Sequence, residues 1–591
     1  MITQRISKLR EKMMENNVQA YIIPTSDFHE TEYVCEYFAC RKYMSGFTGS
    51  AGVLVVLLDK AALWTDGRYF IQAANQLEGT GIDLMRMGQP GVPEIDAYIV
   101  ENLKENDTVG FDGRVMNTKD ALAYKSVFDL AHLNMNVNLD LVNDVWTDRP
   151  QLPSTPTFHY SEKFAGESME SKLSRLRAFL NENKVDSIVL TSVDQIAWLY
   201  NLRAHDIPNF PVALAYSIVS LDSASIYMDA SRLDELSEEE FRKNNVTVCG
   251  YNDIYSATKT LSGSVLVDPS SVNYAIVSNL RAKPVFKESP IILWKALKNE
   301  TELKCTKWAH IKDGVAVTKF MYWLKKNAGK IEMSEMSVQS KLQVFRSEQE
   351  NYLEDSFDTI CAYKEHAAMM HYSSKPETNV EITNSGMLLI DSGGQYLTGT
   401  TDITRTFVLG EMTQEERKDF TIALKAMFRL QNAHFIQDVT TGANLDILAR
   451  GVIYDYDLDY RCGTGHGVGH FLNVHEGPNG LRPKSLYGHE ACIVPGMITT
   501  DEPGVYVEGS HGIRHENELL CVKHTENEYG TFLKFEPITY VPFDIEGLDL
   551  NYLSNHEIAS INEYQQYAFD HIKDSLTQEE KDWYLNNLFI K

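Results

Sequence analysis

Positive charge is scarce in this chain, in which 55 lysines and arginines stand against 82 aspartates and glutamates and leave a formal net charge of −27. A nucleic-acid partner requires basic side chains that neutralise the phosphate backbone. An anionic membrane surface attracts basic segments for the same reason. The composition therefore predicts a protein that binds neither nucleic acid nor membranes, and the excess negative charge is explained by solubility.

Long apolar runs are absent as well. The longest strongly apolar run, AGVLVVLL at residues 51–58, is far shorter than the roughly 20 residues that cross a bilayer. The first residues, MITQRISKLREKMMENN, have helical periodicity and scattered charge, in place of the uninterrupted apolar core of a secretory signal. These two features predict a cytoplasmic protein.

Cysteine pairs of the CxxC type are also missing, although the chain has eight cysteines. Cys35 and Cys40 lie five apart without a second pair that would complete a zinc site. The cysteines are therefore predicted to be free, mostly buried thiols in a reducing compartment.

The length of 591 residues predicts several domains, because single cores rarely exceed roughly 250–300 residues. Residues 147–168 contain three prolines within seven positions and no apolar periodicity, which is typical of a linker. Asn299 and Glu302 form a candidate capping box at the start of an amphipathic run. The predicted domains are residues 1–155, 156–298 and 299–591.

The first two segments share a pattern. The stretch that begins at Ser7 aligns without a gap with the stretch that begins at Ser174, and each consists of an amphipathic helix, a turn and an apolar strand. A single repeat of this length predicts a duplicated α/β domain. Farther on, helical patterns at residues 300–327, 334–351 and 414–438 alternate with β-rich runs, which predicts an α+β domain with an antiparallel sheet.

Two aspartates lie eleven residues apart in IDSGGQYLTGTTDITRTF, with three glycines between them. A glycine turn can fold such runs into a hairpin that brings Asp391 and Asp402 together. Paired carboxylates repel each other unless a cation or a shared proton intervenes. On this motif alone, two turn-capping aspartates are an equally good interpretation.

Three further residues extend this set. Glu502 and Glu516 lie in or beside apolar, β-rich sequence, where a carboxylate needs a partner, a proton or a metal, although each alone is typical of a strand edge. His466 lies in GTGHGVGHFLNVHEGP, which lacks the glycine and lysine pattern of a phosphate loop. Four carboxylates and one imidazole have the composition of a two-cation site. Cations roughly 3.5–4 Å apart can hold a hydroxide and polarise a carbonyl.

These motifs resemble those of the pita-bread metallopeptidase family, which includes aminopeptidase P, prolidase and methionine aminopeptidase. The likeness rests on AYIIPTSDFHETEY, SGFTGSAG and WTDGRYFIQAA in the first segment, and on DSGGQY, GTTDITRT, GTGHGVGHFLNVHEGP, DEPGVY and GIRHEN in the last. It covers nearly the whole chain and is greatest for the three-domain form of aminopeptidase P. It implies two creatinase-like α/β domains, a C-terminal pita-bread α+β catalytic domain, and a homodimer built through that domain.

The resemblance also implies roles for single residues. Asp402 and Glu516 would bridge two divalent ions, most often Mn²⁺, and the complete ligand set would be Asp391, Asp402, His466, Glu502 and Glu516. His371 and His475 would hold the substrate and stabilise charge on the tetrahedral intermediate. Arg68 would contact the substrate, which requires a domain or subunit contact to bring it to the site.

The implied activity is hydrolysis of the bond between an N-terminal residue and a following proline. That bond is a tertiary amide without an N–H group, and a metal-activated water can attack it without that contact. Glu502 would carry the proton to the leaving nitrogen. Prolidase is the alternative activity. A metal-free, creatinase-like amidinohydrolase or a pita-bread binding module, as in histone-chaperone subunits, would lack the ligands.

The chain departs from the family pattern in two places. Cys462 stands where the family often has a histidine, and thiols are weak donors, so His470 is the candidate replacement. The segment EDSFDTICAYKEHAAMMHY, which ends at Tyr372, also differs from the family's usual sequence before His371.

Overall fold

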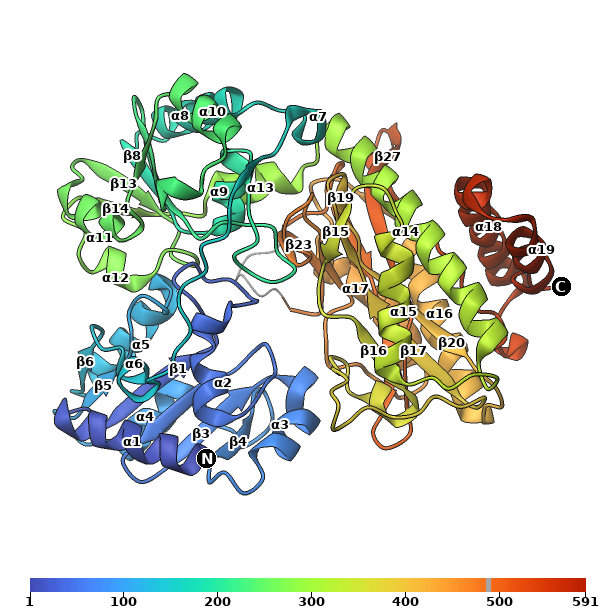
Figure 1. The fold of residues 1–591 in the computed structure, drawn as a ribbon, viewed down its shortest axis with the longest axis horizontal. Helices are drawn as coiled ribbons and strands as arrows, with labels where there is room; N and C mark the ends of the chain where they lie inside the picture. Colours follow the sequence, from blue (N-terminus) through green and yellow to red (C-terminus); the bar gives the residue numbers. More distant parts are fainter. Residues whose placement is uncertain (485–490) are drawn as a thin grey trace. The chain divides into compact units, whose positions relative to one another are not determined.

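The computed structural model describes residues 1–484 and 491–591. The chain divides into two compact units, Met1–Ile291 and Ile292–Lys591 (Figure 1). No helix among the described residues is long and apolar enough to cross a membrane. All eight cysteines are free, as predicted, but only Cys35, Cys361 and Cys521 are buried and the other five are partly exposed, so the prediction of mostly buried thiols is wrong.

The first half of the first unit is a six-stranded sheet in the order β4-β3-β2-β1-β5-β6. Its strands are β1 Ala20–Pro24, β2 Val53–Leu57, β3 Ala61–Thr65, β4 Asp83–Arg86, β5 Thr108–Gly110 and β6 Asn134–Asn136. Its helices are α1 Ile2–Glu15, α2 Cys40–Ser45, α3 Phe70–Leu77, α4 Ile95–Asn102, α5 Thr118–Leu130 and α6 Leu141–Val145. Along β1, Tyr21 and Ile23 pack in one core while Ala20 and Ile22 pack in another, because successive side chains point to opposite faces of a sheet.

The second half repeats this arrangement in the order β12-β11-β10-β8-β13-β14. Its strands are β8 Ser187–Leu190, β10 Tyr216–Ser220, β11 Ala224–Tyr227, β12 Val246–Cys249, β13 Ser264–Val267 and β14 Lys283–Phe286, with the small pair β7 Phe158–His159 and β9 Leu202–Arg203. Its helices are α7 Glu162–Ala165, α8 Met169–Glu182, α9 Val193–Leu199, α10 Glu235–Lys243, α11 Ile254–Ala257 and α12 Tyr274–Val277, and α13 Pro290–Ala296 follows.

The duplicated domain predicted from the sequence is confirmed. Helix α8 has the same 14-residue length as α1. In both sheets the first three strands in sequence, β1, β2 and β3 or β8, β10 and β11, pair antiparallel with one another in turn. The other three pairs of each sheet are parallel. Asn17 and Lys184, at equivalent positions after these helices, both have positive φ. The predicted linker is without helix or strand over residues 147–157, whereas its second part forms β7 and α7.

The second unit is an α+β structure, as predicted. Its helices are α14 Glu300–Asn327, α15 Glu335–Ser347, α16 Gln414–Gln431, α17 Gly442–Tyr454, α18 Asn555–Ile572 and α19 Gln578–Asn587. Its first strands are β15 Tyr352–Asp355, β16 Ile360–Tyr363, β17 Met387–Ser392, β18 Gly394–Tyr396, β19 Gly399–Thr400 and β20 Ile403–Val408. The others are β21 His434–Ile436, β22 Gly465–Gly467, β23 Glu476–Leu481, β24 Ile498–Asp501, β25 Gly504–Val507, β26 His511–Arg514, β27 Asn517–Asn527 and β28 Gly530–Pro537.

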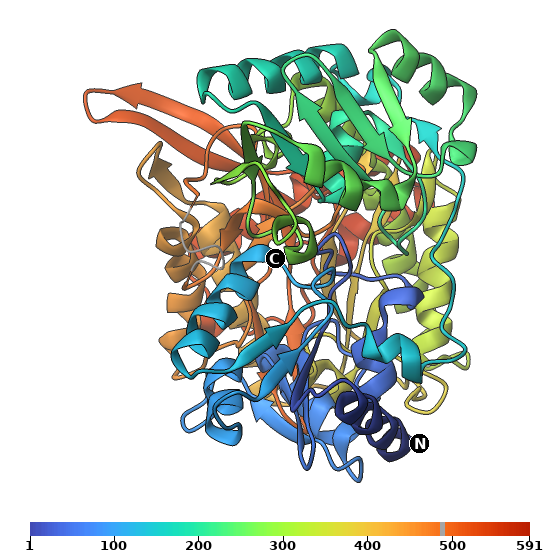
Figure 2. The same cartoon turned by 90° about the vertical axis from the view of Figure 1, so that its left-hand side faces the viewer.

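The main sheet of this unit has the order β21-β28-β27-β24-β22-β23 and is antiparallel throughout. Beyond the sheet, β27 and β28 continue as a two-stranded ribbon, drawn in orange-red in Figure 2. The capping box at Asn299 is confirmed, since the side chain accepts hydrogen bonds from the backbone of Thr301 and Glu302. The helix predicted over 414–438 ends at Gln431, because residues 434–436 pair with β28.

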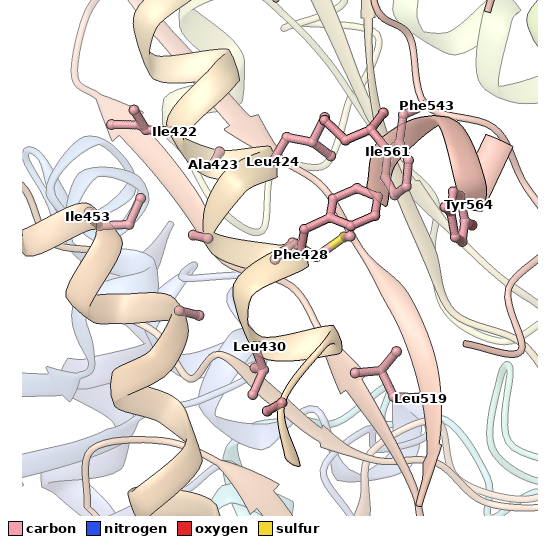
Figure 3. Packing of buried hydrophobic residues seen from close by; sticks show 14 of the residues in the cluster. Ile422, Ala423, Leu424, Phe428, Leu430, Ile453, Leu519, Phe543, Ile561 and Tyr564 are labelled. Carbon is pink, nitrogen blue, oxygen red and sulfur yellow. The ribbon is translucent and has the colours of Figure 1, made fainter. Parts of the chain in front are cut away.

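A hydrophobic core packs α16 against the main sheet and α18. Figure 3 shows Phe428 of α16 beside Phe543 and Tyr564, and the ring centroids of these pairs are 5.7 and 5.9 Å apart. Leu519 of β27 and Ile561 of α18 complete this part of the cluster. The core therefore anchors β27, whose first residue directly follows Glu516. The proposed domain boundaries at 155/156 and 298/299 stay predictions.

Candidate metal and active site

The two aspartates lie on a hairpin, as the glycine pattern predicts. Asp391 in β17 pairs with Thr404 in β20, and Asp402 directly precedes β20. Since side chains alternate along a strand, the three side chains project from the same face. A Cβ atom on Gly393 would lie 1.8 Å from the carbonyl oxygen of Thr401, so only glycine permits this close return of the chain.

A buried ion pair holds this hairpin against the two preceding helices. Arg346 of α15 donates to both carboxylate oxygens of Asp313 in α14, over 2.7 and 3.1 Å, and also to the carbonyl of Ser392. Thr401 donates to Asp313 over 2.6 Å. Sequence reasoning missed this pair, although each residue is a charged group on the apolar face of an amphipathic helix, which is the signal that could have revealed it.

Each of the two glutamates directly follows, or lies two residues beyond, the end of a β-strand. Glu516 lies between β26 and β27, is buried, donates its backbone N–H to the carbonyl of Thr404, and accepts the Thr404 hydroxyl over 2.7 Å. Glu502 lies between β24 and β25, and its backbone N–H donates to Thr464 over 2.7 Å. Backbone pairing of separate strands therefore delivers both carboxylates to the Asp391–Asp402 hairpin.

His466 in β22 turns one ring nitrogen toward the carboxylates. Its Nδ1 lies 2.9 Å from the carbonyl oxygen of Gly467, and because a carbonyl only accepts, this contact places the proton on Nδ1. Nε2 then offers its lone pair 3.4 Å from Asp402 Oδ2 and 3.5 Å from Glu502 Oε1. The ring of His475 lies edge-on at 4.3 Å between centroids.

The five residues predicted as metal ligands are brought together. Ligand atoms of these five residues and of His475 form three overlapping groups, and within each group all atoms lie within 4.8 Å of one another. The groups are Asp391–Asp402–Glu516, His466–Glu502–Glu516 and Asp402–His466–His475. Asp402, His466 and Glu516 each belong to two groups. Of these three, only the carboxylates have two oxygens to offer to two cations, because Nδ1 of His466 is engaged by the carbonyl of Gly467. Asp391 Oδ1 is buried and has no hydrogen-bond donor among the described residues. The donor set therefore fits divalent cations, while the individual ligand roles stay predictions.

Arg514 is the one cation that the tertiary structure adds to this cluster among the described residues. From β26 it donates to Asp391 Oδ2 over 2.5 Å and to the Tyr506 hydroxyl over 2.7 Å, and its Nε lies 3.9 Å from Glu502. Sequence reasoning missed it, although it stands two residues before Glu516 in GIRHEN. One guanidinium offsets only part of the charge of four carboxylates.

Burial and repulsion between the carboxylates raise the pKa values of two carboxyl groups in the cluster. Burial raises the pKa of Asp402 well above its ordinary value, and the charges of Asp391 and Glu502 raise it further. Burial also raises the pKa of Glu516 well above its ordinary value, with Asp402 as the next cause. The cluster therefore takes up protons when no other cation compensates its charge.

We expect the metal-free protein to lose stability as the pH rises above about 4, where unfolded carboxylic acids ionise. Raised folded-state pKa values mean that the folded chain retains protons that the unfolded chain has lost, so the free energy of unfolding falls until the folded carboxyls ionise. Urea denaturation of chelator-treated protein across a pH series measures this slope. Asp402→Asn should flatten it, and an unchanged slope in that variant would contradict the assignment.

The remaining predicted residues lie in different surroundings. His371 follows the 3₁₀ helix η6 (Lys364–Ala368), and the carbonyl of the preceding Met370 accepts from Arg514 Nη2 over 3.4 Å. Arg68 lies in the first unit, where Asp66 accepts from its Nε and Nη2, each over 2.9 Å. Its predicted substrate contact stays a prediction.

Cys462 and His470 occupy positions on the flanks of the site. The side chain of Cys462 packs against the large hydrophobic core, and its carbonyl accepts from Arg450. His470 is buried, with Nδ1 2.9 Å from the hydroxyl of Thr306 in α14. That contact joins His470 to α14, and His470 belongs to none of the ligand groups found among the described residues.

Family models match nearly the whole chain. Residues 304–523 match the metallopeptidase family M24, and residues 531–587 match the C-terminal region of its peptidases. Residues 5–138 and 148–302 match two models of the creatinase/prolidase N-terminal domain, in agreement with the duplicated halves of the first unit.

Individual relatives are similar over their full length. A protein of Botryotinia fuckeliana named "Probable Xaa-Pro aminopeptidase P" is 38% identical over 593 residues, which cover 97% of this chain and 90% of that protein. Aminopeptidase P2 of Arabidopsis thaliana is 36% identical over 636 residues, which cover 99% of this chain and 88% of that protein.

Solved structures agree with these matches. The X-prolyl aminopeptidase of Caenorhabditis elegans, described as a cytosolic enzyme with a di-nuclear active site, superposes with a TM-score of 0.94 at 31% identity and covers 100% of this chain and 99% of that chain. A Xaa-Pro dipeptidase of Bacillus anthracis, at 23% identity and a TM-score of 0.51, shares the fold over 64% of this chain and 99% of that chain. The chain therefore belongs to the Xaa-Pro aminopeptidase P family of M24 metallopeptidases.

Proposed function

We propose that this enzyme removes the N-terminal residue from peptides that have proline at position two, and that two divalent ions support the reaction. The observation that carries the proposal is the overlap of three groups of ligand atoms, in which Asp402, His466 and Glu516 are each shared by two groups. Full-length similarity to aminopeptidases P supports this activity over prolidase, since the dipeptidase matches only 64% of the chain.

We assign the ions to the five predicted ligands, Asp391, Asp402, His466, Glu502 and Glu516. When bound, divalent ions lower the pKa of water and polarise the scissile carbonyl. Arg514 holds Asp391 in place through its 2.5 Å contact and limits the repulsion within the cluster. Manganese is our proposal for the physiological ion, because an oxygen-rich set with one imidazole suits it.

The other predicted residues act on the peptide. The leaving proline nitrogen needs a proton, and Glu502 is our candidate to deliver it, because its side chain is partly exposed while Asp402 and Glu516 are buried. His371 and His475 would stabilise charge on the tetrahedral intermediate, and Arg68 would contact the substrate. A homodimer through the second unit and a cytoplasmic location complete the proposal, and the relative described as cytosolic supports that location.

A peptide panel tests the activity. Purified enzyme loaded with Mn²⁺ should release the first residue from Xaa-Pro-Xaa tripeptides and leave the matched Xaa-Ala-Xaa peptides intact. The prolidase alternative predicts the reverse preference for length, with Xaa-Pro dipeptides cleaved and tripeptides resistant. Rapid cleavage of dipeptides alone, measured by chromatography of the free amino acid, would replace the proposed activity by that alternative.

A further inference from the structure

A buried carboxylate outside the predicted ligand set is hydrogen-bonded to the segment that carries His371. Glu335 is the first residue of α15, and its side chain is fully buried. Its Oε1 accepts the backbone N–H of Tyr363 over 2.8 Å and lies 2.9 Å from Nδ1 of His366. Its Oε2 accepts the hydroxyl of Tyr372 over 2.8 Å.

Two of these three partners precede His371 in the sequence and the third follows it. Tyr363 ends β16, His366 lies within η6, and Tyr372 directly follows His371. One carboxylate therefore binds the segment at its start, middle and end. The rings of His366 and Tyr372 also stack, with centroids 4.6 Å apart and planes at 29°, so the two halves of the segment are joined directly.

Strand β26 packs closely against the backbone of η6. A Cβ atom on Gly512 in β26 would lie 1.8 Å from the carbonyl oxygen of Ala367, so β26 and η6 are in close backbone contact. Arg514 of the same strand donates to the carbonyl of Met370, next to His371. The position of His371 is thus set between β26, which carries Arg514 toward the metal ligands, and Glu335.

We propose that His366, acting through Glu335 and Tyr372, is a positioning residue that sets the orientation of His371 for Xaa-Pro hydrolysis. His366 lies in the stretch YKEHAAMMHY, which ends at Tyr372. The inference rests on the proposed function, since it adds a residue to the same site.

The charge of His366 gives this device a pH dependence. The hydrogen bond to Glu335 raises the pKa of His366 above its ordinary value, and partial burial opposes this effect. Glu365 also raises the pKa. Lys364 of η6 stands two residues before His366 in the chain, and Arg514 of β26 donates to the carbonyl of Met370, four residues after it. His511 of β26 faces Asp419 instead, over 3.1 Å. The hydrogen bond in its charged form is therefore complete below about pH 6.5 and is lost as the pH rises through the raised pKa.

The test compares variants of the full, metal-loaded enzyme. His366→Ala removes the ring, His366→Asn keeps an uncharged donor near the position of Nδ1, and Tyr372→Phe removes one donor to Glu335. His556→Ala, an exposed histidine of α18, is the matched control. Each variant is measured for kcat and KM on an Xaa-Pro-Xaa peptide, for bound metal per chain, and for activity across pH 6 to 9.

We expect His366→Ala to lower kcat/KM roughly 10- to 100-fold, the scale of a lost hydrogen bond to a charged group, with bound metal unchanged. His366→Asn should recover most of the activity but lack the alkaline decline that the charged histidine produces. In a His371→Ala background, His366→Ala should cause no further loss, because residues that act as a unit are not additive.

Several results would overturn the inference. Wild-type kinetics in His366→Ala, or an equal loss in the presence and absence of His371, would assign His366 a merely structural role. If His366→Ala does not fold, wild-type kinetics in both His366→Asn and Tyr372→Phe have the same consequence. A metal-loaded wild type that cleaves no Xaa-Pro peptide would instead refute the proposed function itself, and the inference with it.

Discussion

Asp402→Asn is expected to abolish Xaa-Pro hydrolysis, by at least about 10³-fold, and to reduce the bound metal below two ions per chain. Asp402 belongs to two of the groups of ligand atoms, so in the proposed site its carboxylate would serve both cations. A neutral amide cannot replace a bridging carboxylate. Metal assistance supplies several kcal/mol to such a reaction, and each 1.36 kcal/mol corresponds to a tenfold change in rate.

The variant should remain folded, which separates a lost metal site from a lost structure. Burial and neighbouring carboxylates already raise the pKa of Asp402, so removing its charge relieves repulsion in the metal-free protein. Elemental analysis, thermal melts and peptide hydrolysis measure the three quantities on one preparation. Asp570→Asn makes the same chemical change on the exposed surface of α18 and should leave all three unaltered. Full activity in Asp402→Asn would refute the metal assignment.

Glu476→Ala is expected to lower the free energy of unfolding by about 3–5 kcal/mol, the scale for breaking a buried ion pair. Glu476 directly follows His475, and its oxygens lie 2.8 Å from Lys295 Nζ and 2.5 Å from Lys298 Nζ. All three side chains are almost completely buried. Removing the carboxylate leaves two ammonium groups together in a poorly solvated place.

An exposed pair provides the comparison for this variant. Lys307 and Glu536 are 2.7 Å apart, but both side chains are more than one third exposed, and such pairs contribute at most about 1 kcal/mol. Glu536→Ala should therefore shift the urea midpoint little, whereas Glu476→Ala should shift it strongly. Equal shifts in the two variants would show that the buried lysines are solvated or neutral in solution.

Local patterns were sufficient for much of the fold. The capping box and apolar spacing predicted α14 with the bounds that the structure has, residues 300–327. The repeat predicted that two halves share an architecture, because a helix, turn and strand are encoded by neighbouring residues. The predicted end of α16 was wrong by seven residues, since residues 434–436 pair with residues 532–534 of β28, which no local pattern contains.

The residues of the site also separate into those that the sequence predicted and those that only the structure revealed. Carboxylates and a histidine beside glycine turns marked Asp391, Asp402, His466, Glu502 and Glu516 as candidates, because ligand chemistry is a property of residue type. A charged residue on an apolar helix face could have marked Asp313 and Arg346 as a buried pair, but the roles of Arg514 and Glu335 depend on what they contact in the folded chain.

The sequence alone predicted the two related domains, the antiparallel α+β unit and a set of acidic residues as candidate metal ligands. Tertiary structure alone decided that Arg514 moderates the charge of these carboxylates, that Arg346 anchors their hairpin, and that Glu335 binds both ends of the His371 segment. The physical reason is range: propensity and periodicity act between neighbouring residues, whereas burial and charge depend on side chains that only the folded chain brings together.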